Sequence, residues 1–215
     1  MNYQNVWDQF FLFVDLRFGV YLDQIMGYMY NVQYIEKIQK EISLKTGLSL
    51  TELNKLPFIR GEGPPSSNLE DCLQLEIHRM TQGEFKKNNN PGGFNYDFSI
   101  ENCLSDIFNQ WDCTKEKLGL KKKSLNADDH QIFPIMGYMR DLRNRVQHDL
   151  FGERVLTKKD IIELDESLTG YEFPSFPKGK SITLTDLDVK ALVFEIREQA
   201  EVYFIPYMNQ FIKSC

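Results

Sequence analysis

Hydrophobic residues near the start of the chain recur at alternating intervals of four and three, which is the spacing of one face of an α-helix. The series is interrupted only at Gln39 and consists of Trp7, Phe11, Val14, Phe18, Tyr21, Ile25, Tyr28, Val32, Ile35 and Ile42. A second apolar row widens this face and consists of Phe10, Phe13, Val20, Met26 and Met29. The pattern predicts a long helix in the core of a bundle, and a coiled-coil seam between two chains is the alternative interpretation.

Two stretches rich in glycine, proline and asparagine follow this helix and are predicted to be loops, residues 58–68 and 83–97. Ser99 is the expected N-cap of the next helix, because apolar residues at helical spacing begin directly after it and continue to Trp111.

The second half of the chain predicts two more helices with an insertion between them. The first is expected from Phe133 to Leu150, because Pro134 is tolerated in the first turn of a helix and not in its interior. Residues of about 153–185 alternate weakly around a loop rich in proline and glycine, which predicts a β-hairpin or loop insertion. The last helix is expected to begin near Thr185. The predicted fold is therefore all-α, an up-and-down helical bundle.

Composition and charge narrow the functional classes. The chain has 215 residues, 42% hydrophobic and 26% charged, which suits one globular domain over residues 1–215. Its net charge of −6 argues against a protein that coats DNA through the phosphates. The chain has only four cysteines, which form no C-x-x-C pair, and no signal peptide is recognised, so we expect free thiols, a cytoplasmic location and no zinc site. No other metal or cofactor is expected. Four charged residues interrupt the most apolar stretch, which argues against a membrane span.

The helix expected at 133–150 has an unusual polar face. Its core stripe consists of Ile135, Met139, Leu142, Val146 and Leu150. The other side carries Arg140, Asp141, Arg143, Asn144, Gln147 and His148, and lacks the lysines and glutamates of an ordinary solvated face. These side chains form directional hydrogen bonds, so the face is a candidate binding or catalytic surface.

Arg143 and His148 are five residues apart and therefore point about 140° apart around the helix axis. Two arrangements can bring them to one ligand. Either the arginine stem wraps around Asn144, or a second copy of the helix faces the first across the two-fold axis of a homodimer. Asn144 precedes His148 by four residues, so its amide can orient the imidazole.

The string LRNRVQHD at residues 142–149 resembles the signature of the HEPN domain family, in which an arginine precedes a histidine by a short, partly polar spacer. The resemblance implies a metal-independent endoribonuclease that is active as a homodimer, often a toxin or an abortive-infection defence protein, sometimes with an antitoxin or regulatory partner. Some HEPN toxins carry a tyrosine two residues after the histidine. Leu150 stands at that position here, so neutralisation by modification of such a tyrosine is not expected.

The resemblance also assigns roles to individual residues. His148 would move a proton at the 2′-hydroxyl or the leaving 5′-oxygen of RNA, and Arg143 would bind the phosphate oxygens. Asn144 would hold the histidine or the phosphate. Further contacts to RNA are expected from Arg140, Arg145, Gln147 and the lysine run Lys121, Lys122 and Lys123. The expected products are a 2′,3′-cyclic phosphate and a 5′-hydroxyl.

Other interpretations of the same residues stay open. In one alternative, Arg143 pairs with a carboxylate and His148 simply ends the helix, and the chain is a HEPN-like binding or scaffold protein without catalysis. His148 and Asp149 also form an HD dipeptide, and an HD-type metal phosphohydrolase would need His130 and Asp186 or Asp188 as further ligands and would be inhibited by EDTA. The P-loop, dinucleotide-binding, nucleophile-elbow and H-E-x-x-H motifs are absent from the sequence.

Overall fold

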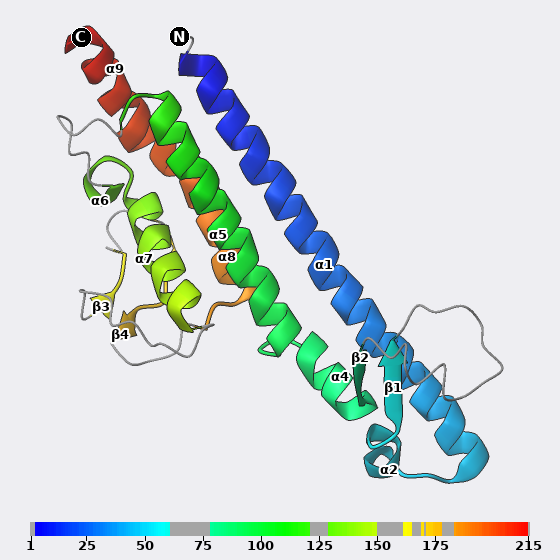
Figure 1. Ribbon diagram of the computed structural model, residues 1–215. Coiled ribbons are helices and arrows are strands. Elements are labelled where there is room, and N and C mark those ends of the chain that lie inside the picture. The colour runs from blue at the N-terminus through cyan, green and yellow to red at the C-terminus, as the bar shows by residue number, and fades with distance from the viewer. Residues whose placement is uncertain are drawn as a thin grey trace. The chain divides into compact units, whose positions relative to one another are not determined.

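The computed structural model describes residues 3–60, 78–120, 129–149, 161–164, 169, 171–177 and 183–214 (Figure 1). The elements in chain order are α1 (Tyr3–Thr46), α2 (Leu50–Asn54), β1 (Pro57–Arg60), β2 (His78–Thr81), α4 (Gln82–Asn89), α5 (Phe94–Lys117), α6 (Asp129–Ile132), α7 (Pro134–Asp149), β3 (Ile161–Ile162), β4 (Phe176–Pro177), α8 (Asp186–Gln199), the π-helical turn η2 (Ala200–Phe204) and α9 (Ile205–Ser214). The fold is an all-α helical bundle, which confirms the predicted fold class.

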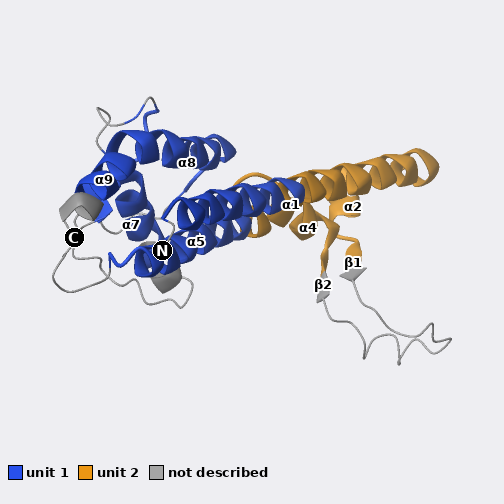
Figure 2. Ribbon diagram, turned by 90° about the horizontal axis from the view of Figure 1, so that it is seen from above, with its two compact units in different colours: residues 1–23, 97–215 blue, residues 24–96 orange. Residues whose placement is uncertain are grey.

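The chain divides into two compact units (Figure 2). The first comprises residues 1–23 and 97–215, and the second comprises residues 24–96. Helices α1 and α5 contribute residues to both units. This division into compact units does not test the predicted single domain over residues 1–215, which stays a prediction.

The helices of the first unit run alternately up and down. Arg197 of α8 forms an ion pair with Asp15 of α1 at 2.5 Å. Tyr21, further along α1, donates a hydrogen bond to Asp186 at the start of α8. Since later residues of α1 meet earlier residues of α8, the two helices are antiparallel. Arg17 of α1 meets Asp106 of α5, and Trp7 of α1 meets Trp111 of α5, so α1 and α5 are also antiparallel. Trp111 meets Phe133, directly before α7, and Phe108 meets Arg143 of α7, so α5 and α7 are antiparallel as well.

An aromatic cluster forms the centre of the first unit. The Trp7 ring stacks on Phe204 with centroids 4.6 Å apart, and Trp111 meets Phe133 edge-on at 5.2 Å. Trp111 and Phe133 are fully buried, and Trp7 keeps 6% of its surface exposed. Large rings from α1, α5, η2 and the junction between α6 and α7 therefore meet in one place, where burial of apolar area is the main stabilising contribution.

The seam that the sequence placed on one face of α1 lies in the core. Its buried members are Trp7, Val14, Tyr21, Ile25, Val32 and Ile35, so this face already packs within the chain rather than forming a seam between two chains. The second apolar row is less buried than expected: Phe10 is fully covered, whereas Val20 is 48% exposed and Met26 45% exposed.

The cysteines of α5 differ in their surroundings. Cys103 is fully buried, and this burial raises the pKa of its thiol to about 12, whereas Cys113 on the same helix is exposed. Because alkylation requires the thiolate, we expect iodoacetamide at about pH 8.5 to modify Cys113 and to leave Cys103 unmodified in the folded protein. Peptide mapping by mass spectrometry measures both sites, and unfolding in guanidinium serves as the control in which both react. Rapid modification of Cys103 in the folded chain would contradict this packing.

A small antiparallel strand pair precedes α8, as predicted for the insertion. Ile161 pairs with Pro177 and Ile162 pairs with Phe176, and both strands lie within the predicted insertion. The insertion is tied to the bundle by two tyrosines. Tyr138 of α7 donates to the Pro174 carbonyl at 2.8 Å, and Tyr171 donates to Asp188 of α8 at 2.7 Å.

The last helical segment begins where the sequence predicted. Thr185 is the N-cap of α8, and Asp188 completes a capping box by accepting from the Thr185 backbone and hydroxyl at 2.7 Å. The π-helical turn η2 directly precedes α9, whose second residue is Pro206. Proline has no N–H to donate, and a wide turn before it rearranges the hydrogen-bond ladder.

In the second unit, Gln39 of α1 hydrogen-bonds to Asn54 at the end of α2 and to Gln82 at the start of α4. Helix α4 packs against the antiparallel pair β1–β2, in which Phe58 lies opposite Met80. The loop predicted at residues 58–68 is wrong for residues 58–60, which belong to β1, and residues 61–68 lie outside the described residues. The loop predicted at residues 83–97 is wrong, because these residues fall largely in α4 and in the first turn of α5. Helix α4 starts with a capping box between Thr81 and Glu84, which stabilises a helix despite the glycine and asparagines that follow. Ser99 accordingly lies inside α5 and is not its N-cap.

Candidate functional site

Helix α7 carries the candidate residues, and its N-terminus is fixed by buried contacts. Pro134 occupies the first position, where its missing N–H breaks no helical hydrogen bond. The N–H of the next residue, Ile135, donates at 2.8 Å to the side chain of Gln199 on α8, which is buried. One free N–H of the first turn is thereby paired, so α7 has a defined position against α8.

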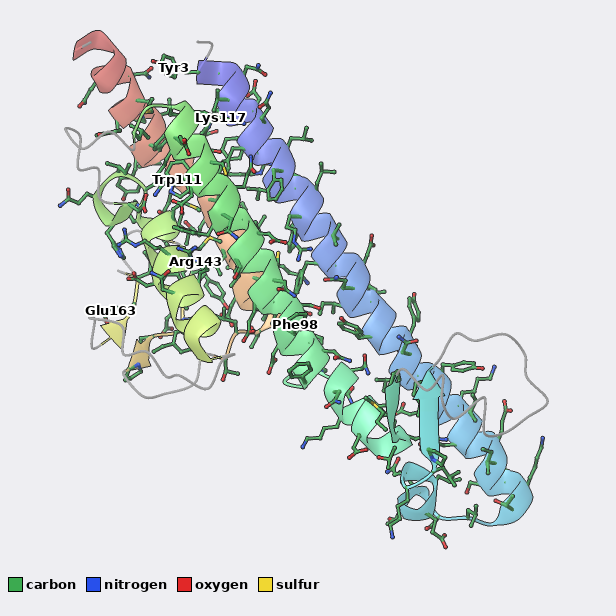
Figure 3. The ribbon with its side chains drawn as sticks, viewed as in Figure 1. Tyr3, Phe98, Trp111, Lys117, Arg143 and Glu163 are labelled. Atoms are coloured by element: carbon green, nitrogen blue, oxygen red, sulfur yellow. The ribbon has the colours of Figure 1, made fainter. Side chains whose placement is uncertain are left out.

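Arg143 points from α7 towards α5 (Figure 3). Its guanidinium carbon lies 4.6 Å from the centre of the Phe108 ring, and Nη1 donates to the Asn109 side chain at 3.3 Å. The Nε atom is buried and has no acceptor among the described residues. Among the described residues, the Arg143 guanidinium therefore contacts an aromatic ring and a neutral amide, and it forms no ion pair with a carboxylate.

A pocket opens beside Arg143, between α5, α7 and the residues that precede α8. Its walls are Asp97, Ile100, Glu101, Leu104, Ser105, Leu142, Arg143 and Leu184. Asp97, Glu101 and Ser105 succeed each other at intervals of four on α5, so they form one polar row along this pocket. Oxygen acceptors on α5 thus line the same small cavity as the guanidinium on α7.

Asp97 is a site residue that sequence analysis missed. Partial burial raises the pKa of its carboxyl, and no hydrogen bond or ion pair joins it to another described residue. An incompletely paired acid and an incompletely paired guanidinium therefore line one pocket, a combination typical of ligand sites. No pattern along the chain marks Asp97, which lies in the stretch 83–97 predicted to be a loop.

The structure describes the side chains of only some of the other predicted site residues. Arg140 lies 3.4 Å from Asp129 and 3.6 Å from Asp141, so carboxylates already compensate its charge. Asn144 is half-buried on α7. The structure describes the backbone of α7 at Arg145, Gln147 and His148 but not their side chains. The lysine run Lys121, Lys122 and Lys123 lies entirely outside the described residues.

His130 lies on α6 and forms a contact that the sequence did not reveal. Its Nε2 lies 3.0 Å from the Asp141 carboxylate on α7. The ring also packs closely against the α7 backbone, since a Cβ placed on Gly137 would lie 2.6 Å from Nδ1 and 2.8 Å from the His130 backbone nitrogen. Gly137 therefore permits the close approach of α6 to α7.

We expect Gly137→Ala to destabilise the fold by about 1–3 kcal/mol, because the new methyl group must displace backbone as well as side-chain atoms of His130. Gly19→Ala is the matched control, since a Cβ at this position of α1 meets nothing within 4 Å. The control should stabilise the helix by about 0.5–1 kcal/mol. Urea unfolding measures both variants, and equal effects of the two substitutions would contradict the tight packing at Gly137.

The residues that an HD-type metal site would need have other partners. His130 pairs with Asp141, Asp186 accepts from Tyr21, and Asp188 accepts from Tyr171 and Thr185. Across the described ranges, no three histidine, cysteine, aspartate or glutamate side chains are grouped so as to hold a metal ion.

Comparison with known proteins adds no assignment. No family model, curated protein or solved structure matches this chain. Separately, none of the helices that the structure describes combines the length and hydrophobicity needed to cross a membrane.

Proposed function

We propose that this protein is a metal-independent endoribonuclease of the HEPN type, with Arg143 and His148 as its catalytic residues and a role as a toxin or in antiviral defence. The single observation that carries the proposal is the state of Arg143. An arginine that only stabilised the fold would be expected to pair with a carboxylate, whereas this guanidinium rests on Phe108 and Asn109 beside a pocket.

The chemistry follows from the residue types. The 2′-hydroxyl of RNA attacks the adjacent phosphorus and loses its proton to His148. The phosphorus–5′-oxygen bond breaks, and the leaving oxygen receives a proton, which yields a 2′,3′-cyclic phosphate and a 5′-hydroxyl. Arg143 stabilises the negative charge of the phosphorane through its planar set of N–H donors. Asn144 precedes His148 by one helical turn and orients it.

We further propose that the protein acts in the cytoplasm as a homodimer under the control of an antitoxin or regulatory partner. Arg143 and His148 diverge by about 140° on one helix, and a second copy across a two-fold axis brings the two residue types into one cleft. Sedimentation at micromolar concentration tests this part, and a strict monomer that still cleaves RNA would overturn it.

The test of the activity is incubation of the purified protein with RNA in EDTA. We expect cleavage products that end in a 2′,3′-cyclic phosphate. A matched oligonucleotide with 2′-deoxyribose at the cleavage site should stay intact, because it lacks the nucleophile. Inhibition by EDTA, or cleavage of the deoxy substrate, would overturn the proposed mechanism.

A binding or scaffold protein without catalysis is the second candidate. Leu12, Leu16 and Val20 form a row on α1 in which each side chain is between 48% and 63% exposed, and an exposed apolar row favours a protein interface. A protein of this kind would bind a stable partner and would leave RNA intact under the same conditions.

A further inference from the structure

The second unit contains a buried polar network that is independent of the proposed ribonuclease site. Gln39 lies on the buried face of α1 and is only 1% exposed. Its Nε2 donates to the Asn54 side chain at 3.1 Å and to the Gln82 side chain at 3.0 Å, while its Oε1 accepts from Lys86 Nζ at 2.8 Å. Both ends of the amide are therefore paired, and the network fixes the position of the Lys86 ammonium.

Lys86 is a half-buried cation with a neutral partner. It lies on α4, and among the described residues its only hydrogen-bond partner is the Gln39 carbonyl oxygen. An ammonium has three N–H donors, so the network leaves two of them without a partner in the described part of the chain. A half-buried charge in this state favours an anionic ligand, because desolvation strengthens its attraction to a negative group.

The ammonium faces a groove of about 350 Å³ between α1, α2 and α4. The groove is lined by Glu36, Gln39, Lys40, Ser43, Leu44, Leu50, Leu53 and Lys86. Leu53 is buried in its wall, while Leu44 is 79% exposed and Leu50 58% exposed. A volume of this size with apolar walls and a few polar groups is typical of small-molecule sites.

The charges along the groove indicate the ligand class. Lys40 and Lys86 supply two positive charges and Glu36 supplies one negative charge, which leaves an excess of one. A monoanion complements this excess, whereas Glu36 would repel a dianion. The exposed leucines need an apolar body to cover them.

We infer that the groove between α1, α2 and α4 binds a small organic carboxylate with an apolar body, whose charged group pairs with Lys86 while its hydrocarbon part covers Leu44 and Leu50. The inference does not depend on the proposed ribonuclease activity, because the residues of the groove belong to the second unit and those of the proposed catalytic site to the first.

Octanoate is the probe for the experiment, and isothermal titration calorimetry with the full-length chain measures its dissociation constant. We expect Lys86→Gln to weaken octanoate binding about tenfold or more, since a hydrogen bond to a charged group is lost. Lys87→Gln is the matched control, because Lys87 is the exposed neighbour on α4 and removal of its charge should leave binding unchanged. Leu44→Ser, at an exposed position, should weaken binding without unfolding the chain.

Two comparisons decide the outcome. Octanol and octylamine carry the same apolar chain without the negative charge, and we expect both to bind at least about tenfold more weakly than octanoate. Equal binding of octanol, unchanged binding by the Lys86→Gln variant, or no binding of octanoate to a folded parent chain would each overturn the inference. Circular dichroism of every variant verifies that a loss of binding is not a loss of fold.

Discussion

Replacement of His148 by alanine is expected to lower the rate of RNA cleavage in EDTA by about 10²–10⁴-fold, the usual contribution of a positioned acid–base group. Arg143→Ala should lower it by about 10²–10³-fold, because a donor to the developing phosphorane charge is removed. Arg143→Lys should recover only part of this loss, since lysine keeps the charge and lacks the planar pair of donors. Single-turnover rates measured with one labelled RNA separate these effects from binding.

His130→Gln is the matched control for the histidine. Glutamine can still donate to Asp141, and we expect this variant to keep the cleavage rate of the parent chain once the folded fraction is taken into account. Full activity of both the His148→Ala and the Arg143→Ala variants would remove the proposed site. Loss of activity in the His130→Gln variant together with inhibition by EDTA would instead favour the metal-dependent HD mechanism.

The largest expected loss of stability comes from Asp129→Ala. Asp129 is 2% exposed and accepts from Trp111 Nε1 at 3.0 Å and from Lys115 Nζ at 2.8 Å, while Arg140 lies 3.4 Å away. Removal of this carboxylate leaves the buried indole N–H and two cations without their common partner. We expect a loss of about 3 kcal/mol in the free energy of unfolding, measured in urea by tryptophan fluorescence.

Asp112→Ala is the control for this substitution. Asp112 also pairs with Lys115, at 3.0 Å, but its side chain is 33% exposed and the pair spans less than one helical turn. Its loss should cost less than about 1 kcal/mol. A similar effect of the two substitutions would show that the burial of Asp129 does not govern the strength of the network.

The elements that the sequence predicted well are those whose signal is local and repeated. The apolar period of α1, the position of Pro134 at the start of α7 and the capping box of Thr185 each depend on residues within a few positions of one another. Each signal agrees with the tertiary packing, so the prediction and the structure coincide.

Helix α4 was missed although its signal was present. Thr81 and Glu84 form a capping box, but Gly83 and the asparagines at the end of α4 have low helix propensity and favour a loop. In the structure, Phe85 is buried and Asn89 donates to the Phe85 carbonyl, so packing and a side-chain hydrogen bond stabilise a helix that composition alone disfavours.

The candidate site was predictable only in part. Arg143 was identified from its motif, whereas Asp97 shares its pocket through the packing of α5 against α7, which brings together residues far apart in the chain. The pairing of Arg140 with Asp129 is also a tertiary contact. No pattern along the chain distinguishes an arginine that is paired in this way from one that is available to bind RNA.

In the last segment, buried side chains recur at every fourth position, at Leu192, Ile196, Ala200, Phe204 and Met208. A period of four drifts by about 40° at each step on an ordinary α-helix, and the wide turn η2 absorbs part of this drift. Deletion of a single residue within η2 would yield an uninterrupted helix, but it would rotate α9 by about 100° and carry Met208 away from the core. The C-terminal segment should therefore accept conservative substitutions more readily than a change of its length.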